Sequence, residues 1–278
     1  MKIKPILSHI ILITVSILSI FPFLWLISTS LKGAGENIFA YPPNFFPTDF
    51  TFENYVGVWG KVNFLKYFFN SFVVAFFTVI LNLIFSSMAA YPLARMEFKG
   101  KKTAFFAILA TIMIPFQTIM LPIYLIILKL NLIDSAGTVP GYLGLILPFA
   151  VSAFGIFLMR QAFLAIPKEM EEAAIVDGCN SWQIFFKVLL PMVKPTLAIL
   201  AIFTFIGSWG EFLWPSIVLS DEKMFTLPVG INNLQGIFSS NWRYIAAGSI
   251  ISIIPIIVFF LSLQRYFISG QNEGAVKG

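Results

Sequence analysis

The chain has 278 residues, of which 58% are hydrophobic and 11% are charged, and its formal net charge is +5. Soluble domains carry about 25% charged residues, and a water-soluble fold of this length could not hide 32 phenylalanines together with the other apolar side chains. The composition therefore excludes a soluble protein and predicts one that lies in a lipid bilayer.

Six apolar runs are long enough to cross a bilayer, which takes about 20 residues. In chain order they are residues 7–31, 68–91, 103–128, 142–163, 196–219 and 245–268. Prolines interrupt several of them, which bundled helices tolerate because neighbouring helices satisfy the freed carbonyls. We therefore expect an all-α membrane protein with six transmembrane helices.

The first run has an alternative interpretation as a signal peptide, because Lys2 and Lys4 precede it. Its apolar stretch is longer than the 7–15 residues of a signal peptide's apolar region, and no A-x-A cleavage site follows it. We expect a retained first span.

Lys and Arg residues are distributed unevenly over the segments between the spans. If the N-terminus is cytoplasmic, 12 of the 18 Lys and Arg residues fall on the cytoplasmic side, four of them in the turn at residues 95–102. The positive-inside rule favours this topology, with both termini in the cytoplasm. The basic residues are spread over several loops rather than forming one stripe, so they do not indicate nucleic-acid binding.

Residue types that carry catalysis are scarce. His9 is the only histidine and Cys179 the only cysteine, no Walker A pattern occurs, and no cluster of metal ligands is apparent. A proton-coupled carrier usually has ionisable residues deep in its spans, and only Glu211 qualifies here, toward the outer end of the fifth span. We expect a path without its own energy source: a non-catalytic subunit that is driven from outside.

The polar segment between the fourth and fifth spans, about residues 160–195, is predicted to form two short helices. Pro167 suits a first helical position, and Glu169, Glu171 and Glu172 favour the positive end of the helix dipole. Gly178 suits a left-handed helix stop. A solvated connector is the alternative, although long loops in compact proteins tend to be functional.

The side chains of these two helices form apolar patterns. Met170, Ala173 and Ala174 share one face of the first helix at i, i+3 and i+4. Ser181 is expected to cap the second helix and Pro191 to end it. In that helix the residues expected to lie on the protein's apolar underside are Trp182, Phe185, Phe186 and Leu189.

The same segment resembles a known motif. Glu172-Ala173-Ala174, Gly178 and Leu190-Pro191 match the EAA loop of ABC importer permeases, and the full run over residues 172–191 is similar to the carbohydrate-uptake branch, the family of the maltose transporter's smaller permease. Further matching stretches are residues 209–215, 226–230, 264–267 and 274–278; Asn272-Glu273 departs from that branch's usual small or uncharged residues.

The resemblance implies a type I ABC importer (MetI-like) permease fold that forms one transmembrane domain over residues 1–278. Its parts would be a first span with an extracellular loop (1–66), a five-span core (67–268) with a cytoplasmic coupling loop at about 164–195, and a cytoplasmic tail (269–278). The implied location is a bacterial or archaeal plasma membrane. The implied partners are a second permease in a heterodimer, an ATPase dimer that binds ATP and Mg, and an extracellular solute-binding protein; the chain itself would need no cofactor.

The resemblance also implies roles for individual residues. Coupling to the ATPase would fall to Glu172, Ala173, Ala174, Asp177, Gly178, Leu190 and Pro191. The tail at 274–278 would reach the ATPase interface. In the outer loop 220–243, Asn232, Asn233 and Gln235 are candidates for contact with the binding protein, against a plain polar loop. The long outer loop at 32–66 is a second candidate for that contact, because its aromatic residues suit an interface; packing of the loop on itself is the alternative.

Glu211 and the substrate leave alternatives open. Glu211 is hypothesised to face the translocation path, because carboxylates at bilayer depth usually face a cavity; the alternative is a group near the outer interface beside Trp209 and Trp214. The expected substrate is an oligosaccharide, with glycerol phosphate, a phosphodiester, a polyol or a peptide as alternatives on the same fold. A secondary carrier is a more remote alternative.

Overall fold

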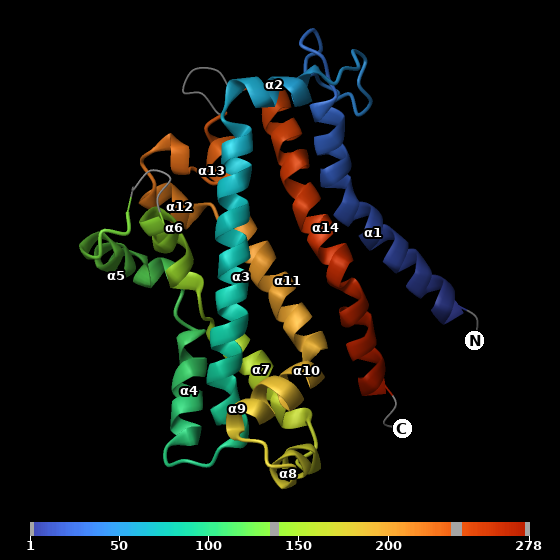
Figure 1. The fold of residues 1–278 in the computed structure, drawn as a ribbon. Helices are drawn as coiled ribbons and strands as arrows, with labels where there is room; N and C mark the ends of the chain where they lie inside the picture. Colours follow the sequence, from blue (N-terminus) through green and yellow to red (C-terminus); the bar gives the residue numbers. More distant parts are fainter. Residues whose placement is uncertain (1–2, 134–138, 235–240, 276–278) are drawn as a thin grey trace. The chain divides into compact units, whose positions relative to one another are not determined.

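The computed structural model describes residues 3–133, 139–234 and 241–275 (Figure 1). All of the regular elements in these residues are helices, apart from one isolated bridge between Lys32 and Phe50. The chain divides into two compact units: residues 1–65 with 227–255, and residues 66–226 with 256–278. The expected all-α membrane fold is confirmed.

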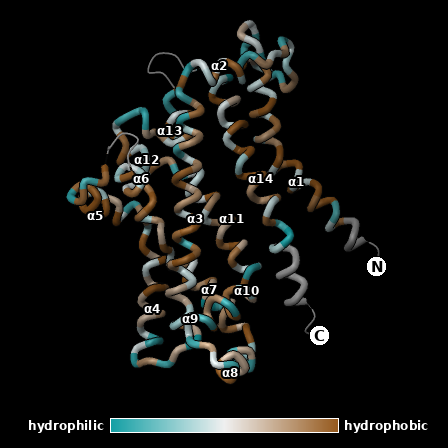
Figure 2. The backbone as a smooth tube through the Cα atoms, viewed as in Figure 1, coloured by the Kyte–Doolittle hydropathy of each residue, from teal (hydrophilic) through white to brown (hydrophobic). Residues whose placement is uncertain are grey.

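Three helices are each long and apolar enough to cross a membrane without a break: α1 (Ile3–Ser30), α3 (Phe64–Arg95) and α14 (Trp242–Ala275). Three further candidate spans are pairs of helices with a sharp bend between them. The described residues therefore hold three continuous spans, or up to six if each bent pair is one span. Figure 2 shows hydrophobic colours along much of α3 and hydrophilic ones at the turn that follows it.

The first bent pair is α4 (Lys101–Thr111) with α5 (Phe116–Lys129), at 98°. This pair covers the run expected as a span over 103–128, and the bend lies at the interrupting Pro115. Pro115 occupies the N-cap position of α5, where its missing N–H and its effect on the preceding residue both oppose a continuous helix.

The second bent pair is α6 (Val139–Ile146), continued by the 3-10 turn η1 (Leu147–Phe149), with α7 (Ala153–Ala165), at 58°. Ser152 caps α7 by accepting a hydrogen bond from the Gly155 N–H at 3.0 Å. The bend interrupts the predicted span over 142–163 close behind Pro148.

The third bent pair joins residues 181–192 to α11 (Lys194–Gly210) at 78°. The predicted span over 196–219 does not continue to its end, because α11 stops at Gly210 and a new short helix, α12 (Leu213–Val218), begins three residues later. The backbone at Glu211 is extended, with ψ at 119°, which explains the break.

The first unit contains α1, α2 (Glu53–Lys61), α13 (Leu227–Asn232) and the beginning of α14. Its loop after α1 is held by a buried ion pair of 3.3 Å between Lys32 Nζ and Glu36 Oε1. Asn54 donates to the carbonyls of Ser30 and Lys32, and Arg243 donates to the carbonyl of Glu36. This loop is therefore an ordered structure built on buried polar contacts.

The second unit holds two apolar clusters. One cluster gathers the C-terminal half of α3, with α4, α7 and residues 174–200, around the fully buried Met159, Phe163 and Leu189. The other surrounds Trp214, whose indole Nε1 donates to the Gly144 carbonyl at 3.1 Å. The backbone of Gly144 also lies close to that of Leu132. A β-carbon on Gly144 would lie 2.2 Å from the Leu132 carbonyl oxygen, so this position requires glycine.

Candidate functional site

The acidic segment after α7 folds into the first of the two expected helices, α8 (Glu169–Val176). Its first turn carries three glutamates, which the helix dipole favours. Gly178 has a φ of +80° and its N–H donates to the Ile175 carbonyl at 3.0 Å, so the predicted left-handed stop is confirmed. Pro167 lies before the helix rather than at its first position, since Lys168 is the N-cap.

The second expected helix differs from its prediction in its cap. Asn180, not Ser181, is the N-cap: its side chain accepts from the Gln183 N–H at 2.9 Å, and the Gln183 side chain accepts from the Asn180 N–H at 2.8 Å. This reciprocal pair is a capping box. It begins α9 (Ser181–Gln183), which runs directly into a π-helical stretch, η2 (Ile184–Leu189).

The π-helical stretch also changes which side chains face inward. Phe185 and Leu189 are buried as predicted, but Trp182 is 61% exposed and Phe186 is 53% exposed. Phe186 lies within the π-helical stretch, whose wider turn shifts its side chain away from α-helical spacing, whereas Trp182 precedes that stretch, in α9. Pro191 does not end the helix, because it lies inside α10 (Leu190–Met192) and the chain turns at Val193.

The residues expected to couple to a partner differ in their exposure. Glu172, Ala173, Asp177 and Gly178 are exposed on α8 and its stop, whereas Ala174 is 6% exposed and belongs to the apolar cluster beneath. Met170 is also exposed, so the expected common face of Met170, Ala173 and Ala174 is divided between solvent and interior. At the other end of the segment, Leu190 is half-buried and Pro191 exposed.

Sequence reasoning missed two apolar residues on this surface. Ile175 is 59% exposed and Val176 is 86% exposed, directly before the Gly178 stop. Together they form a small apolar surface beside the carboxylate of Asp177. In the sequence, the only sign of this surface was the position of Ile175 and Val176 between Ala173-Ala174 and Asp177.

Two arginines join α8 and α7 to the end of α3. Arg95 donates to the carbonyls of Phe163, at 2.7 Å, and Ile166, and its Nε lies 3.6 Å from a Glu171 carboxylate oxygen. Arg160 donates from Nε to the Leu93 carbonyl at 3.0 Å. In the sequence, both arginines served only as evidence for the membrane topology. In the structure, Arg160 holds α7 to the end of α3, and Arg95 holds the end of α3 to the beginning of α8.

A cleft of about 250 Å³ lies beside these contacts, between the end of α3 and the beginning of the α9–η2 segment. Its lining is apolar and aromatic, with Met88, Met96, Tyr91, Trp182 and Phe185 among its residues.

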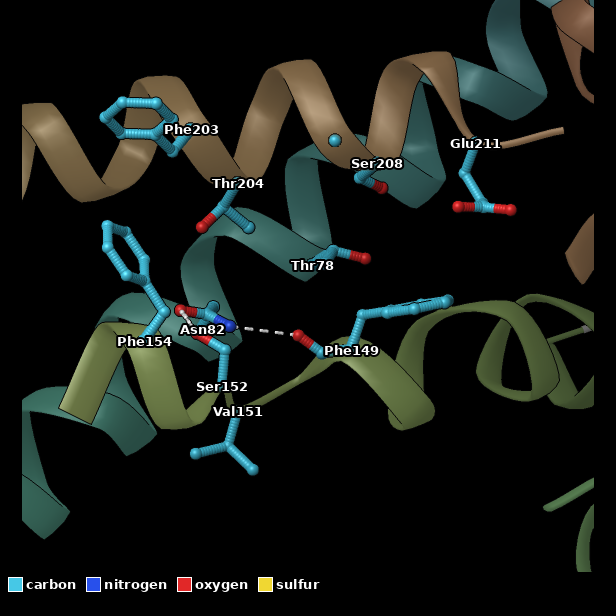
Figure 3. Close-up of a pocket in the computed structure, with 11 residues that line it drawn as sticks. Thr78, Asn82, Phe149, Val151, Ser152, Phe154, Phe203, Thr204, Ser208 and Glu211 are labelled. Atoms are coloured by element: carbon cyan, nitrogen blue, oxygen red, sulfur yellow. Dashed lines mark hydrogen bonds between the residues drawn. The ribbon is translucent and has the colours of Figure 1, made fainter. Parts of the chain in front are cut away.

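A second cavity of about 290 Å³ lies among α3, α7 and α11 (Figure 3). Three phenylalanines form its apolar walls: Phe149, Phe154 and Phe203. Its polar lining residues are Thr78, Asn82, Ser152, Thr204, Ser208 and Glu211. Aromatic walls with a few placed polar groups are typical of small-molecule sites.

Asn82 is the best-held polar group in this cavity. Its Nδ2 donates to the Phe149 carbonyl at 3.1 Å, and its Oδ1 accepts from Ser86 Oγ at 3.2 Å. Thr78 lies one turn earlier on α3 and is 1% exposed, and its hydroxyl has no hydrogen-bond partner among the residues that the structure describes. A buried hydroxyl without a partner is costly, and in Figure 3 Thr78 points into the cavity, where a ligand could satisfy it.

Glu211 lines the same cavity, and one of its carboxylate oxygens accepts a hydrogen bond from the Trp214 N–H at 3.0 Å. Glu211 therefore lies at a cavity, as the hypothesis of a translocation-path residue expects, and also contacts Trp214, which the alternative names as a neighbour. In Figure 3 its carboxylate is directed toward the space between α11 and η1.

The predicted outer contact residues are only partly described. Asn232 ends α13 and Asn233 follows it, and both are exposed. Gln235 lies outside the described residues, as does part of the tail at 274–278. The expected loop is in fact helical over Leu227–Asn232. In the part of the chain that the structure describes, no group of three or more His, Cys, Asp or Glu residues is arranged to hold a metal ion.

Comparison with known proteins gives one family and several close relatives. The family described as "Binding-protein-dependent transport system inner membrane component" matches residues 82–271. The chain is 38% identical over 265 residues to the arabinooligosaccharides transport system permease protein AraQ of Bacillus subtilis, covering 95% of this chain and 92% of AraQ. It is 32% identical over 274 residues to the sn-glycerol-3-phosphate transport system permease protein UgpE of Yersinia pestis, covering 95% of each chain.

A solved structure shares the fold over nearly the whole length. It is the crystal structure of a bacterial ABC transporter involved in the import of the acidic polysaccharide alginate, and one of its chains matches with a TM-score of 0.81 and 28% identity. The match covers 96% of this chain and 97% of that chain.

Proposed function

Because the chain belongs to the family of binding-protein-dependent transport system inner membrane components, we propose that it is one permease subunit of an ATP-driven importer of oligosaccharides. Membership in this family makes it a non-catalytic, multi-pass membrane protein with the permease fold of ABC importers. The specific proposals concern its substrate, its partners, its orientation and the residues that couple it to ATP hydrolysis.

The observation that carries the substrate proposal is the cavity among α3, α7 and α11. Its three phenylalanines offer apolar faces and its hydroxyl and amide groups offer hydrogen bonds, which together suit sugar rings with their apolar faces and hydroxyl rims. The relatives AraQ, for arabinooligosaccharides, and the alginate importer support a carbohydrate. UgpE supports the alternative, sn-glycerol 3-phosphate.

Coupling to the ATPase is assigned to α8 and its stop. The exposed Glu172, Ala173 and Asp177 would contact the partner, with Gly178 giving the sharp turn after the helix. Ala174 would act from beneath, as a small residue that lets α8 lie close to the apolar cluster. Leu190 and Pro191 close the segment against α11, so a displacement of α8 would reach that helix.

The proposed partners are a second permease, a cytoplasmic ATPase dimer that binds ATP and Mg, and an extracellular solute-binding protein. In the proposed orientation both termini and α8 face the cytoplasm, as the distribution of Lys and Arg favours. Asn232 and Asn233 would then face outward, together with the loop after α1, in position for the binding protein. Glu211 and the cavity around it would line the translocation path.

Uptake into proteoliposomes that contain the complete importer tests this function. The chain is co-expressed with its proposed partners, a second permease, an ATPase and a binding protein. Labelled arabino-, xylo- and malto-oligosaccharides are offered with sn-glycerol 3-phosphate as the competing solute. We expect oligosaccharide uptake that requires ATP and the binding protein and that survives a protonophore. Uptake of glycerol phosphate alone would favour the alternative substrate, and uptake without the ATPase would contradict an ATP-driven importer.

A further inference from the structure

Cargo charge varies among the relatives, since one is named for neutral oligosaccharides, one for a phosphate ester and one for an acidic polysaccharide. We propose that the cavity of this chain admits uncharged, hydroxyl-rich solutes and rejects anions, and that Glu211 sets this selection. The inference rests on the proposed function in taking the cavity as part of the solute path.

Glu211 is the only ionisable side chain among the residues that line the cavity. No Lys, Arg or His is among them to balance its charge. The N-terminus of α7 adjoins the cavity at Ser152, but a helix N-terminus carries only about half an elementary charge, and Ser152 Oγ already accepts from the Gly155 N–H. Among the described residues that line the cavity, Glu211 is therefore the one that can place a full negative charge there.

The backbone and one hydrogen bond hold this carboxylate in place. α11 ends at Gly210, the backbone at Glu211 is extended, and the Trp214 N–H binds one carboxylate oxygen. Trp214 itself is fully buried, with its indole bound to the Gly144 carbonyl. Glu211 therefore has an anchor on one oxygen, which holds its carboxyl group at the cavity.

The rest of the lining favours a neutral polar solute. Thr78 presents a buried hydroxyl that lacks a partner, and a solute hydroxyl can donate to it or accept from it. The rings of Phe154 and Phe203 lie edge to face, with centroids 5.8 Å apart, and both are about half exposed. A sugar ring finds both kinds of contact here, whereas a carboxylate or phosphate would meet a like charge at short range.

The selection is measured with a cysteine placed in the cavity. Ser208→Cys is introduced in a Cys179→Ser background, because Cys179 is the only native cysteine. The reaction rates of the cysteine at residue 208 are measured in the membrane-embedded importer without the binding protein. Two thiosulfonate reagents of equal size are compared, one ending in an ammonium and the other in a sulfonate. We expect the ratio of cationic to anionic rate to fall about tenfold or more when Glu211→Gln is added, because a fixed unit charge at short range in a partly buried site acts with at least that strength.

Two controls separate charge from structure. Glu211→Asp keeps the carboxylate and should keep the high ratio, while Gln keeps an oxygen acceptor for the Trp214 N–H. A cysteine at the 98%-exposed Tyr41 should show a ratio that Glu211→Gln leaves unchanged. An unchanged ratio at residue 208, or a cysteine there that neither reagent reaches, would overturn the proposal.

A transport measurement distinguishes this inference from the proposed function. The Glu211→Gln importer is compared with wild type for uptake of a transported neutral oligosaccharide and of its aldonate, which has a carboxylate at the reducing end. We expect the aldonate-to-neutral ratio to rise about tenfold in the variant. If neutral oligosaccharide is taken up but Glu211→Gln changes neither the aldonate-to-neutral ratio nor the thiol reaction rates, the proposed role of Glu211 is overturned and the proposed function stands. If the wild-type importer takes up no oligosaccharide, the proposed function is overturned.

Discussion

Single residues decide where the acidic helix stops and how it is held. Gly178 has positive φ with no atom within 4 Å of the position that a β-carbon would take, so only the backbone conformation requires glycine there. At Arg95 the side chain is required instead, because its buried guanidinium donates hydrogen bonds to two carbonyls. The consequences of changing each residue therefore differ in kind.

Gly178→Ala should destabilise the end of α8 by about 1–2 kcal/mol, the cost of a left-handed conformation for a residue with a β-carbon. The matched control is Gly60→Ala in α2, where a β-carbon also meets nothing within 4 Å but φ is not positive; this change should be neutral or stabilise by up to about 1 kcal/mol. Thermal unfolding in detergent measures both. Equal effects of the two changes would refute the backbone argument.

Glu36 gives the first unit a pH dependence. Burial raises the pKa of its carboxyl, but hydrogen bonds from the Asp49 and Thr48 N–H groups and the contact with Lys32 outweigh burial and hold the pKa below its ordinary value of 4.5. The stabilisation is therefore complete above pH 4.5 and is lost as the pH falls through the lower folded-state value.

Glu36→Gln should lower the thermal midpoint at pH 7, and the difference from wild type should shrink below pH 4.5. Glu53→Gln, at an exposed glutamate of the same unit, is the control and should have little effect at either pH. Scans at pH 7 and pH 3.5 measure the difference. A difference for Glu36→Gln that is the same at both values would contradict the sign of the pKa shift.

At the scale of elements, the proposed functional groups lie where helices break. The cavity adjoins the break between η1 and α7 and the break between α11 and α12, and α8 follows the end of α7. Broken helices in membranes are tolerated where the irregular backbone lies in protein or lines a cavity. Breaks of this kind explain how Ser152 and Glu211 present polar groups to the cavity.

Arg95→Lys should loosen the junction of α3, α7 and α8. Arg95 donates to both carbonyls from Nη2 and places Nε beside Glu171. Lysine retains the charge, but its side chain is one bond shorter and lacks the Nε group, so we expect a loss of about 1.5–3 kcal/mol in the stability of the second unit. Glu171→Gln tests the other contact of Arg95 and should cost about 1 kcal/mol or less, because Glu171 is partly exposed. Protease sensitivity and thermal unfolding measure both variants, and a larger cost for Glu171→Gln would show that the ion pair matters more than the carbonyl contacts.

At the scale of the whole molecule, composition and run length predicted the class and the apolar segments, because spanning a bilayer constrains every residue of a span. The breaks could not be predicted in the same way. Pro22 and Pro255 lie inside continuous helices, whereas Pro115 lies at a break, and only packing around each proline distinguishes the cases. The Glu211 cavity combines residues from three parts of the chain, which periodicity cannot bring together.

Orientation in the membrane is tested by labelling. Val176→Cys, at the 86%-exposed end of α8, and Tyr41→Cys, in the loop after α1, are each made in the Cys179→Ser background. An impermeant maleimide should label residue 176 only in inside-out vesicles and residue 41 only in right-side-out vesicles. The reverse pattern would invert the proposed topology.

The central claim is that ATP hydrolysis by a partner moves this chain through the exposed surface of α8. Ala173→Trp enlarges that surface at an exposed alanine, and Ala104→Trp makes the same change at an exposed alanine of α4. ATP-driven oligosaccharide uptake by the reconstituted importer is the direct measurement. We predict that Ala173→Trp abolishes uptake and its coupling to ATP hydrolysis while Ala104→Trp retains both; wild-type uptake with tryptophan at residue 173 would contradict the claim.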